Sequence, residues 1–314
     1  MAWRLKLVPH ETHIPFMRLR RITFPLSIIG TIVSIVLFFS VGLNTGIDFQ
    51  GGTMIEIRTT DGPANIADFR ETLGALNLGD VQIQEFGGAN DLLIRVERQE
   101  GGEEAEQAVV AKVKAALGSN IEYRRVEVVG PRVSGELTRS GFYAVAAALV
   151  AILIYIWFRF EWQFAVGAII ATLHDVIMTI GFFAVTRIDF DLTSIAAVLA
   201  IIGYSLNDTV IIYDRIRENL RKYKKMPVEE LLDQSVNNTL SRTLMTSGTT
   251  LLALAALFFF GGEVIRSFTA AMIWGIVVGT YSSVFIAAAA LLIFKVRRGG
   301  VGSARAEAAD EQTA

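Results

Sequence analysis

Four ionisable side chains lie in or beside apolar segments of this sequence, where charge is costly. Asp208 lies six residues before Asp214, near the end of one apolar segment. His174 and Asp175 lie ten and eleven residues into another, and Arg242 opens a third. A charged group at bilayer depth costs at least about 2.5–3.5 kcal/mol on insertion scales, and such groups form proton relays or ion pairs. We predict a proton relay of Asp208, Arg242, His174 and Asp175; a buried ion pair that only fixes helix register is the alternative.

Polar side chains near these groups extend the predicted relay. The segments that carry Asp208 and Arg242 follow one another in the chain, so as helices they run antiparallel and an Asp208–Arg242 pair is sterically reasonable. An arginine side chain is long and can bend along its helix toward a neighbour. Hydroxyl and amide groups satisfy neighbouring helices or hold water. The supporting polar residues that we predict are Tyr204, Ser205, Asn207, Thr246 and Ser247. Whether His174 and Asp175 belong to the relay or are structural stays open.

The composition excludes several kinds of catalytic site. The chain has no Cys, which excludes disulfides, thiolate catalysis and Cys-ligated metals. Its three His residues, His10, His13 and His174, are too few and too scattered for a His-rich metal site. No H-E-x-x-H motif is present. We therefore expect no enzymatic activity, no metal and no cofactor, with a proton gradient as the energy source. The net charge of −2 gives no indication of nucleic-acid binding.

Six apolar segments are each long enough to cross a membrane as a helix. Of the 314 residues, 52% are hydrophobic and only 19% are charged, and a helix needs about 20 residues to cross the hydrocarbon core. Buried helices of a large soluble protein are a weak alternative, because such helices are rarely this long and carry a polar face. The predicted transmembrane helices are 22–42, 140–158, 164–186, 192–213, 243–262 and 267–294.

The basic residues near these helices predict the orientation. Seventeen Lys and Arg residues lie in the segments 1–21, 159–163, 214–242 and 295–314, whereas the opposite short loops hold two. Cytoplasmic loops carry an excess of Lys and Arg. We therefore predict a multi-pass protein of the bacterial inner membrane with both termini in the cytoplasm. Helices 2 to 6 then occupy 140–294, with a cytoplasmic connector at 214–242.

The long segment 43–139 has the composition of a folded domain and lies on the periplasmic side. Alternation of apolar and polar residues predicts four strands, and helical spacing predicts two helices. Their order, β-α-β-β-α-β, is that of the ferredoxin-like fold. The predicted elements are strands 53–59, 81–86, 92–97 and 121–129 and helices 65–76 and 103–117. Nothing in the domain indicates catalysis, so binding of a partner or polypeptide, for example by strand addition, and a passive spacer are equally supported.

Glycines in the two connections of this domain predict hinges. Glycine adopts backbone conformations that other residues avoid, and hinges absorb large backbone changes. The predicted hinge and turn residues are Gly46, Asp48, Gly51, Gly52, Gly130 and Gly135. Pro131 favours the opposite interpretation, a fixed domain on stiff connections.

The connector between the fourth and fifth transmembrane helices is rich in basic residues. Its basic run could lie on anionic lipid, and a solvated connector is equally supported. Pro227 is expected to open a separate short helix at 228–236.

Four motifs follow one another along the chain. The first is GIDFQGG at 46–52, and the second is LHDV at 173–176. The third, GYSLNDT at 203–209, runs on to DRIREN at 214–219, and the fourth is TLSRT at 239–243. In this order they resemble the SecF family of protein-export membrane proteins, from the first motif to the last transmembrane helix.

The resemblance implies a fold and a function. A SecF-like chain is half of an RND-type transporter, with six transmembrane helices and a periplasmic domain between the first two; SecD supplies the other half, related by a pseudo-two-fold axis. The implied partners are SecD, the SecYEG channel, YajC, YidC, exported polypeptides and the lipid bilayer. The family uses the proton-motive force, and the acid and arginine that match Asp208 and Arg242 are implicated in proton flow.

Two other functions compete with protein export. An RND-type efflux component would need larger external loops, because about 95 residues cannot easily enclose an aromatic-lined pocket. A passive translocon scaffold needs no ionisable residues at membrane depth.

Overall fold

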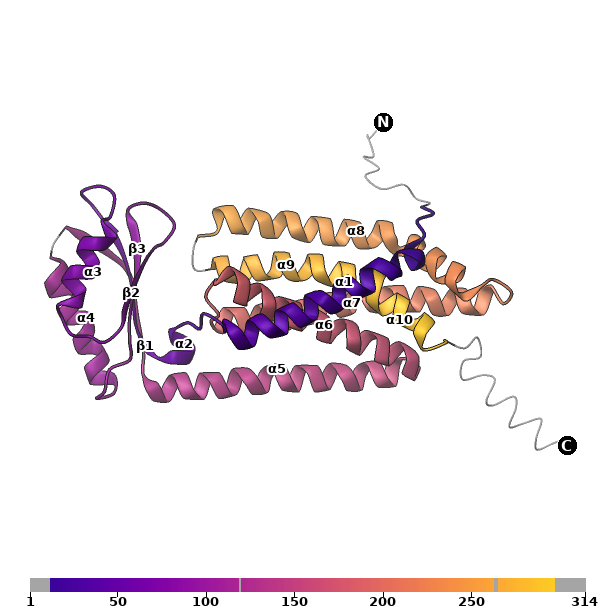
Figure 1. Ribbon diagram of the computed structural model, residues 1–314, viewed down its shortest axis with the longest axis horizontal. Helices are drawn as coiled ribbons and strands as arrows, with labels where there is room; N and C mark the ends of the chain where they lie inside the picture. Colours follow the sequence, from indigo (N-terminus) through magenta and orange to yellow (C-terminus); the bar gives the residue numbers. More distant parts are fainter. Residues whose placement is uncertain (1–11, 119, 263–264, 297–314) are drawn as a thin grey trace.

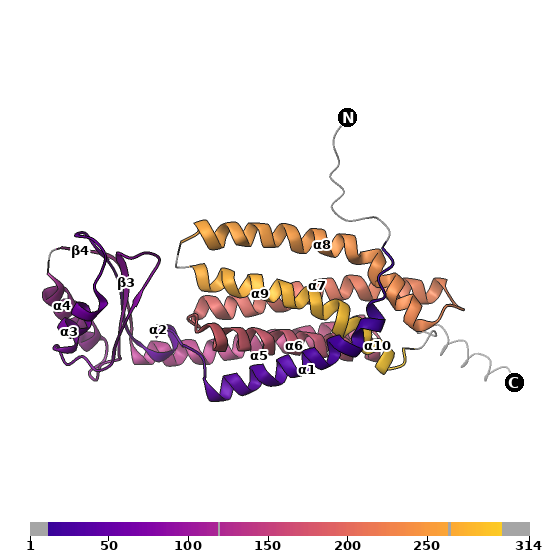
Figure 2. The same cartoon turned by 45° about the horizontal axis from the view of Figure 1, so that its top comes forward.

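The computed structural model describes residues 12–118, 120–262 and 265–296. It consists of a long bundle of helices with a small sheet domain at one end (Figure 1). The view turned by 45° shows the same separation between the two parts (Figure 2). The helices of the bundle run along the long axis of the molecule, so one end of the bundle faces the sheet domain and the other end faces away from it.

Six helical segments of the described chain are long and apolar enough to cross a membrane. The polytopic helical fold class that the sequence predicts is confirmed. The segments are α1 (Phe16–Ser40), α5 (Pro131–Arg159), α6 (Trp162–Thr186), α7 (Leu192–Lys222), α8 (Val228–Phe260) and Arg266–Ile293, which comprises α9 (Arg266–Ser282), the π-helix η2 (Ser283–Ala287) and α10 (Ala288–Ile293).

The bundle has an inner and an outer set of helices. In the most apolar stretches of α6, α7 and the segment Arg266–Ile293, 50%, 44% and 67% of the residues are buried, against 11% to 17% in α1, α5 and α8. The outer helices expose large apolar side chains such as Ile22, Phe142 and Leu252. Because these faces would be unstable in water, they fit contact with lipid or with other membrane helices.

Several helix ends differ from the sequence-based expectation. The first helix begins at Phe16, six residues before the predicted start, because helical hydrogen bonding continues beyond the part that hydropathy detects. The separate short helix at 228–236 is a wrong prediction, since Pro227 caps the single continuous helix α8. A proline at this position loses no hydrogen bond and leaves the helix that follows it intact. The prediction that a helix starts at Pro227 is therefore confirmed, but this helix continues to Phe260 and includes the fifth transmembrane segment.

The sheet domain has the ferredoxin-like topology. Its elements are β1 (Gly52–Thr59), α3 (Ile66–Gly74), β2 (Val81–Glu85), β3 (Asp91–Val96), α4 (Glu103–Leu117) and β4 (Ile121–Val129). The strand order is β2-β3-β1-β4, and every neighbouring pair is antiparallel. This arrangement confirms the predicted order of strands and helices.

The two faces of the sheet have different neighbours. The core between the sheet and the helices α3 and α4 contains Ile55, Ile57, Leu73, Leu92 and Val113. Ile55 and Ile57 are two residues apart, as expected for one face of a strand. The opposite face turns toward the helix bundle, with α3 and α4 on the far side (Figure 1). The sheet of the domain, and not its helices, therefore faces the helix bundle.

Candidate functional site

His174 and Asp175 are neighbours on α6 in the interior of the bundle. Nδ1 of His174 lies 2.9 Å from Oδ1 of Asp175. Asp175 is fully buried at 0% exposure, and His174 is 7% exposed. Asp175 faces inward because it continues the buried positions Ala171 and Thr172 by one helical turn. Asp175, which the sequence places eleven residues into an apolar segment, therefore lies in the interior of the bundle.

Two serines from other helices bind the second oxygen of the same carboxylate. Ser205 Oγ on α7 and Ser282 Oγ at the end of α9 donate to Oδ2 of Asp175 at 2.5 Å and 2.7 Å. Three helices thus meet at one carboxylate, which satisfies the rule that buried polar groups are hydrogen-bonded. Sequence reasoning found Asp175, His174 and Ser205 but missed Ser282. Its only signal is a pair of serines in a long apolar run.

Close packing of α7 against α9 makes this meeting point possible. A Cβ atom added to Gly279 would lie 3.0 Å from the Cβ of Ser205, and Gly275 faces Ile201 in the same way. The Gly-x-x-x-Gly spacing therefore lets two helices of one chain approach each other. The π-helix η2 begins directly after Ser282, and its first residue, Ser283, has its Oγ 3.0 Å from Oγ1 of Thr209. Short π-helical stretches occur often at functional sites.

Asp208 differs from Asp175 in having no hydrogen-bond partner among the residues that the structure describes. It lies on α7 one turn beyond Ser205 and is 1% exposed. Neither of its carboxylate oxygens has a hydrogen-bond partner among the described residues. Leaving a buried acceptor unsatisfied costs about 1–3 kcal/mol, and more when it is charged. Asp208 is therefore the unsatisfied acid of the bundle interior.

Asp208 and Arg242 are near enough for the charge of Arg242 to act on the carboxylate, but they make no direct ion pair or hydrogen bond among the described residues. Arg242 lies on α8 with its side chain exposed. The reason is the phase of the helix: the buried positions Thr239, Thr243 and Ser247 recur every four residues, and Arg242 lies beside that stripe. The prediction of a direct pair is wrong for this structure.

The supporting polar residues divide into an inner and an outer group. Tyr204 donates to Ser247 Oγ at 3.3 Å, and Ser247 lies 2.9 Å from Oγ1 of Thr280, so α7, α8 and α9 are joined by hydroxyl groups. Asn207 and Thr246 are exposed instead. Together with Arg242 they give the α7–α8 side of the bundle a polar outer surface.

The predicted hinge segment 44–52 is fastened to the loop between α6 and α7. Gly46 and Phe190 join through the hydrogen bond from Gly46 N to Phe190 O, at 2.8 Å. Asp48, in the short helix α2 (Ile47–Gln50), accepts from the backbone N–H of Leu192 at 3.0 Å. Leu192 is the first residue of α7, so Asp48 satisfies a free donor at that helix start. Gly46 and Asp48 therefore hold the segment in place.

Gly51 and Gly52 form a turn that other residues fit poorly. Their φ angles are +76° and +108°, in the region that favours glycine. A Cβ atom at Gly52 would lie 2.5 Å from the carbonyl oxygen of Val96. These glycines direct the chain from α2 into β1. On the other connection, Gly130 precedes α5, but Gly135 lies inside that helix, so its place as a hinge in a linker is a wrong prediction.

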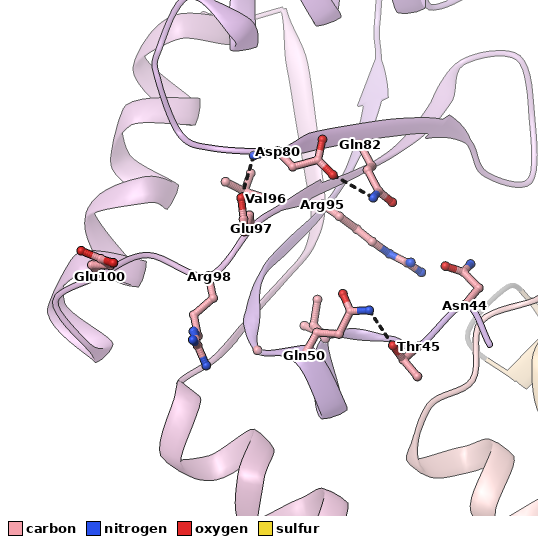
Figure 3. Close-up of a pocket in the computed structure, with 12 residues that line it drawn as sticks. Asn44, Thr45, Gln50, Asp80, Gln82, Arg95, Val96, Glu97, Arg98 and Glu100 are labelled. Atoms are coloured by element: carbon pink, nitrogen blue, oxygen red, sulfur yellow. Dashed lines mark hydrogen bonds between the residues drawn. The ribbon is translucent and has the colours of Figure 1, made fainter. Parts of the chain in front are cut away.

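A polar cavity of about 500 Å³ lies between α2 and the sheet. Figure 3 shows the side chain of Arg95, from β3, reaching across this cavity toward Asn44. Arg95 makes an ion pair with Asp189 in the loop between α6 and α7. Burial lowers the pKa of the Arg95 guanidinium, while the charge of Asp191 raises it. The domain is thus attached to the loop that joins the two helices carrying Asp175 and Asp208.

The sequence matches known families in two regions. Residues 109–297 match the family described as "Protein export membrane protein SecD/SecF, C-terminal", and residues 36–62 match "SecD/SecF GG Motif". The chain is 46% identical over 309 residues to the protein translocase subunit SecF of Cereibacter sphaeroides, covering 96% of this chain and 95% of that protein. It is 48% identical over 302 residues to subunit SecF of Rhodobacter capsulatus, covering 91% and 90%.

Longer, fused relatives match as well. The protein translocase subunit SecDF of Brucella abortus is 48% identical over 294 residues, which are 94% of this chain and 39% of that protein. A crystal structure of SecDF from Thermus thermophilus, described as a translocon-associated membrane protein, is 33% identical with a TM-score of 0.80 and covers 95% of this chain and 40% of that one. The chain thus spans about 40% of the length of these SecDF proteins. It belongs to the SecD/SecF family of protein-export membrane proteins, as a subunit of the SecF kind.

Proposed function

We propose that this Sec protein-export subunit uses the proton-motive force to promote movement of polypeptides across the bacterial inner membrane. In this proposal it works with SecD and the SecYEG channel, with YajC and YidC as further partners. Both termini lie in the cytoplasm, and the domain 43–139 lies in the periplasm. The observation that carries the proposal is the buried carboxylate of Asp208, which accepts no hydrogen bond from the described residues.

A carboxylate in this position is best explained by gain and loss of a proton. A carboxylate that stays charged at membrane depth without a hydrogen-bond partner is costly. A carboxylic acid that stays neutral would have no property that the amide of asparagine lacks. Asp175 is chemically alike but has hydrogen-bond partners on three helices. We assign proton exchange first to Asp208, with Asp175 and His174 next to it through Ser205.

The same geometry supports a route from the membrane to the domain. The loop between α6 and α7 bonds to the domain through the ion pair of Asp189 with Arg95, and to α2 through Leu192 and Asp48. A shift of α7 that follows protonation would therefore pull on the domain. One charge that crosses about 150 mV is worth about 3.5 kcal/mol, enough to change a two-state equilibrium several hundred-fold.

Two observations support the remaining parts of the proposal. The exposed polar residues Asn207, Arg242 and Thr246 lie where lipid contact would be unfavourable, which fits a protein partner there, and SecD is the partner we assign. A solved structure of SecDF is described as being in the super-membrane-facing form, and a named form implies that SecDF adopts more than one conformation. This description supports the proposal of a movable domain. We propose neither covalent catalysis nor a cofactor.

Export into inverted membrane vesicles tests the proposal. Vesicles with the chain and vesicles without it would import a secreted reporter, each with and without a protonophore. We expect the chain to stimulate transport only while the proton gradient is intact, and the protonophore to bring both preparations to the same level. Stimulation that survives the protonophore unchanged would support the passive scaffold instead.

A further inference from the structure

A cavity of about 660 Å³ lies at the end of the bundle that faces away from the sheet domain. It is bounded by the last residue of α5 and the last three turns of α7, and none of its residues belongs to the proposed relay. Its lining residues are Arg159, Arg217, Arg221, Lys222, Asp214 and Glu218. Four basic side chains thus face two acidic ones.

The two acids of the cavity are already neutralised by neighbours. Arg159 donates to both oxygens of Asp214 at 2.9 Å and 3.0 Å. Glu218 pairs with Arg215 at 2.7 Å. By contrast, Arg221 and Lys222 have no ion pair in the part of the chain that the structure describes, although the Lys222 ammonium lies 5.0 Å from the centre of the Tyr223 ring. The cavity therefore keeps an excess of positive charge.

Two guanidinium groups are held in place by an aromatic ring. The guanidinium carbons of Arg159 and Arg217 lie 5.0 Å and 5.6 Å from the centre of the Phe160 ring. Stacking on an aromatic face orients the planar group at little further entropic cost. A planar fork of N–H donors matches the oxygens of a phosphate group. Arg159 is engaged with Asp214, whereas Arg217 lies 3.9 Å from the same carboxylate and is held more loosely. Arg217, oriented by the ring, is therefore the donor that the cavity presents to an anionic phosphate beside Arg221.

The surroundings of the cavity match the edge of a bilayer. Trp157, Phe158 and Trp162 flank Arg159 in the chain and are 60%, 85% and 53% exposed. Aromatic residues of this kind collect at membrane–water interfaces. From Asp214 to Arg221 the helix rises about 10 Å, which is enough to cross the polar headgroup layer of one leaflet, about 5–7 Å deep.

We propose that this cavity binds the headgroup of an anionic phospholipid, with the phosphate between Arg217 and Arg221 and the acyl chains along the exposed aromatic residues of α5. Basic pockets between transmembrane helices bind anionic headgroups by this chemistry. The inference rests on the membrane placement of the bundle and not on proton coupling. Failure of the lipid site and failure of the proposed function are therefore separate outcomes.

Native mass spectrometry of the full chain tests the site. The chain is purified in detergent and titrated with phosphatidylglycerol and, separately, with phosphatidylcholine. The variants are Arg221→Gln and the double variant Arg221→Gln/Lys222→Gln. Lys225→Gln is the matched control, because it removes one charge from the same end of the bundle outside the cavity. The three positions that are changed, 221, 222 and 225, carry exposed side chains, so we expect the fold to be retained and check it by circular dichroism.

We expect tighter binding of phosphatidylglycerol than of phosphatidylcholine by the unmodified chain. Each basic residue near a membrane surface contributes about 1 kcal/mol, so Arg221→Gln lowers the affinity about fivefold and the double variant about twenty-fivefold. Lys225→Gln leaves the affinity within about twofold. Equal losses in Lys225→Gln and Arg221→Gln, or no preference for the anionic lipid, overturn the proposal. Displacement of the lipid by millimolar inorganic phosphate also overturns it, because the ligand is then free phosphate.

Discussion

At the scale of single residues, the two buried acids of the bundle are held in opposite ways. Asp175 has His174, Ser205 and Ser282 as partners, whereas Asp208 has none among the described residues. Hydrogen bonds to a carboxylate stabilise its charged form, and burial without them destabilises it. The first acid therefore joins helices, and the second is the buried acid that no hydrogen bond holds.

Ser282→Ala tests the structural role of Asp175. The change removes one donor from the carboxylate, and interhelical hydrogen bonds in membranes contribute about 0.6 kcal/mol on average and at most about 1.7 kcal/mol. We expect a loss of stability of this size, measured by thermal unfolding in detergent. Ser40→Ala is the control, because the Ser40 hydroxyl is exposed and bonds only to Val36 O of its own helix. Equal stability of both variants contradicts the role of Ser282.

Arg242→Lys tests the exposed arginine of α8. We expect impaired export, because lysine lacks the planar fork of donors with which arginine can bind a carboxylate or a partner helix. Arg132→Lys, at a side chain that is 93% exposed near the start of α5, is the matched control. Normal export with both Arg242→Lys and Arg242→Ala would mean that Arg242 serves only to orient α8 in the membrane, as a basic residue at the cytoplasmic end of a helix.

The sequence predicts the ionisable residues at this scale better than it predicts their contacts. A charge in an apolar run is visible without a structure, as Asp208 shows. The missing pair with Arg242 depends on helix phase, which a difference of one residue changes by about 100°. Ser282 was missed because a single hydroxyl does not alter the hydropathy of its segment. Its role depends on a helix that is distant in the chain.

At the scale of elements, the turn from α2 into β1 depends on two glycines with positive φ. Gly52 and Gly62 have similar φ angles of +108° and +120°, but only Gly52 has a neighbour, the Val96 carbonyl, in the way of a side chain. A side chain at Gly62 would therefore cause backbone strain alone, whereas a side chain at Gly52 would cause backbone strain and steric overlap. The strand pairing of β1 with β3 begins at this turn, with Thr53 opposite Val96.

Gly52→Ala is expected to destabilise the domain more than Gly62→Ala does. Both variants carry backbone strain of about 1–3 kcal/mol, and overpacking at Gly52 adds a further loss of about 1–3 kcal/mol. Hydrogen exchange at the β1 and β3 amides measures the difference. Similar exchange in the two variants would show that the turn can move away from Val96 without loss.

Element order and strand pairing were predictable, and element ends were less so. The alternation in 53–59 and 92–97 identifies strands because burial on one face requires a period of two. By contrast, α8 is one helix with a polar first part and an apolar second part. Hydropathy detects only the apolar part, although the backbone hydrogen bonds run through both. Gly135 lies in the polar first part of α5, which hydropathy assigns to the linker before the helix.

At the scale of the whole molecule, the ion pair of Arg95 with Asp189 connects the domain to the bundle. Both side chains are largely buried, at 13% and 26% exposure, so the pair is less screened than one at the surface. Together with the bond from Leu192 to Asp48, it ties the domain to the start of α7. If protons move α7, these contacts are the direct path to the domain.

A charge swap tests this connection. Arg95→Asp places two acids together and should loosen the domain, and adding Asp189→Arg should restore it, with a coupling energy of about 0.5–3 kcal/mol. Because the chain has no Cys, spin labels on cysteines introduced at Glu71 and Phe260 report one distance. We expect a broader distance distribution in the single variant and a narrow one in the double variant. An unchanged distribution in the single variant means that the ion pair does not position the domain.

Export by Asp208→Asn under an imposed proton gradient tests the central claim most directly. Asparagine keeps the size and polarity of the side chain but cannot titrate, so the variant should insert normally. Asp68→Asn, at an exposed position of α3, is the control for the same chemical change. We predict that the gradient stimulates export by the unmodified chain and by Asp68→Asn and has no effect on Asp208→Asn. Gradient-dependent export by Asp208→Asn at normal expression would contradict the account.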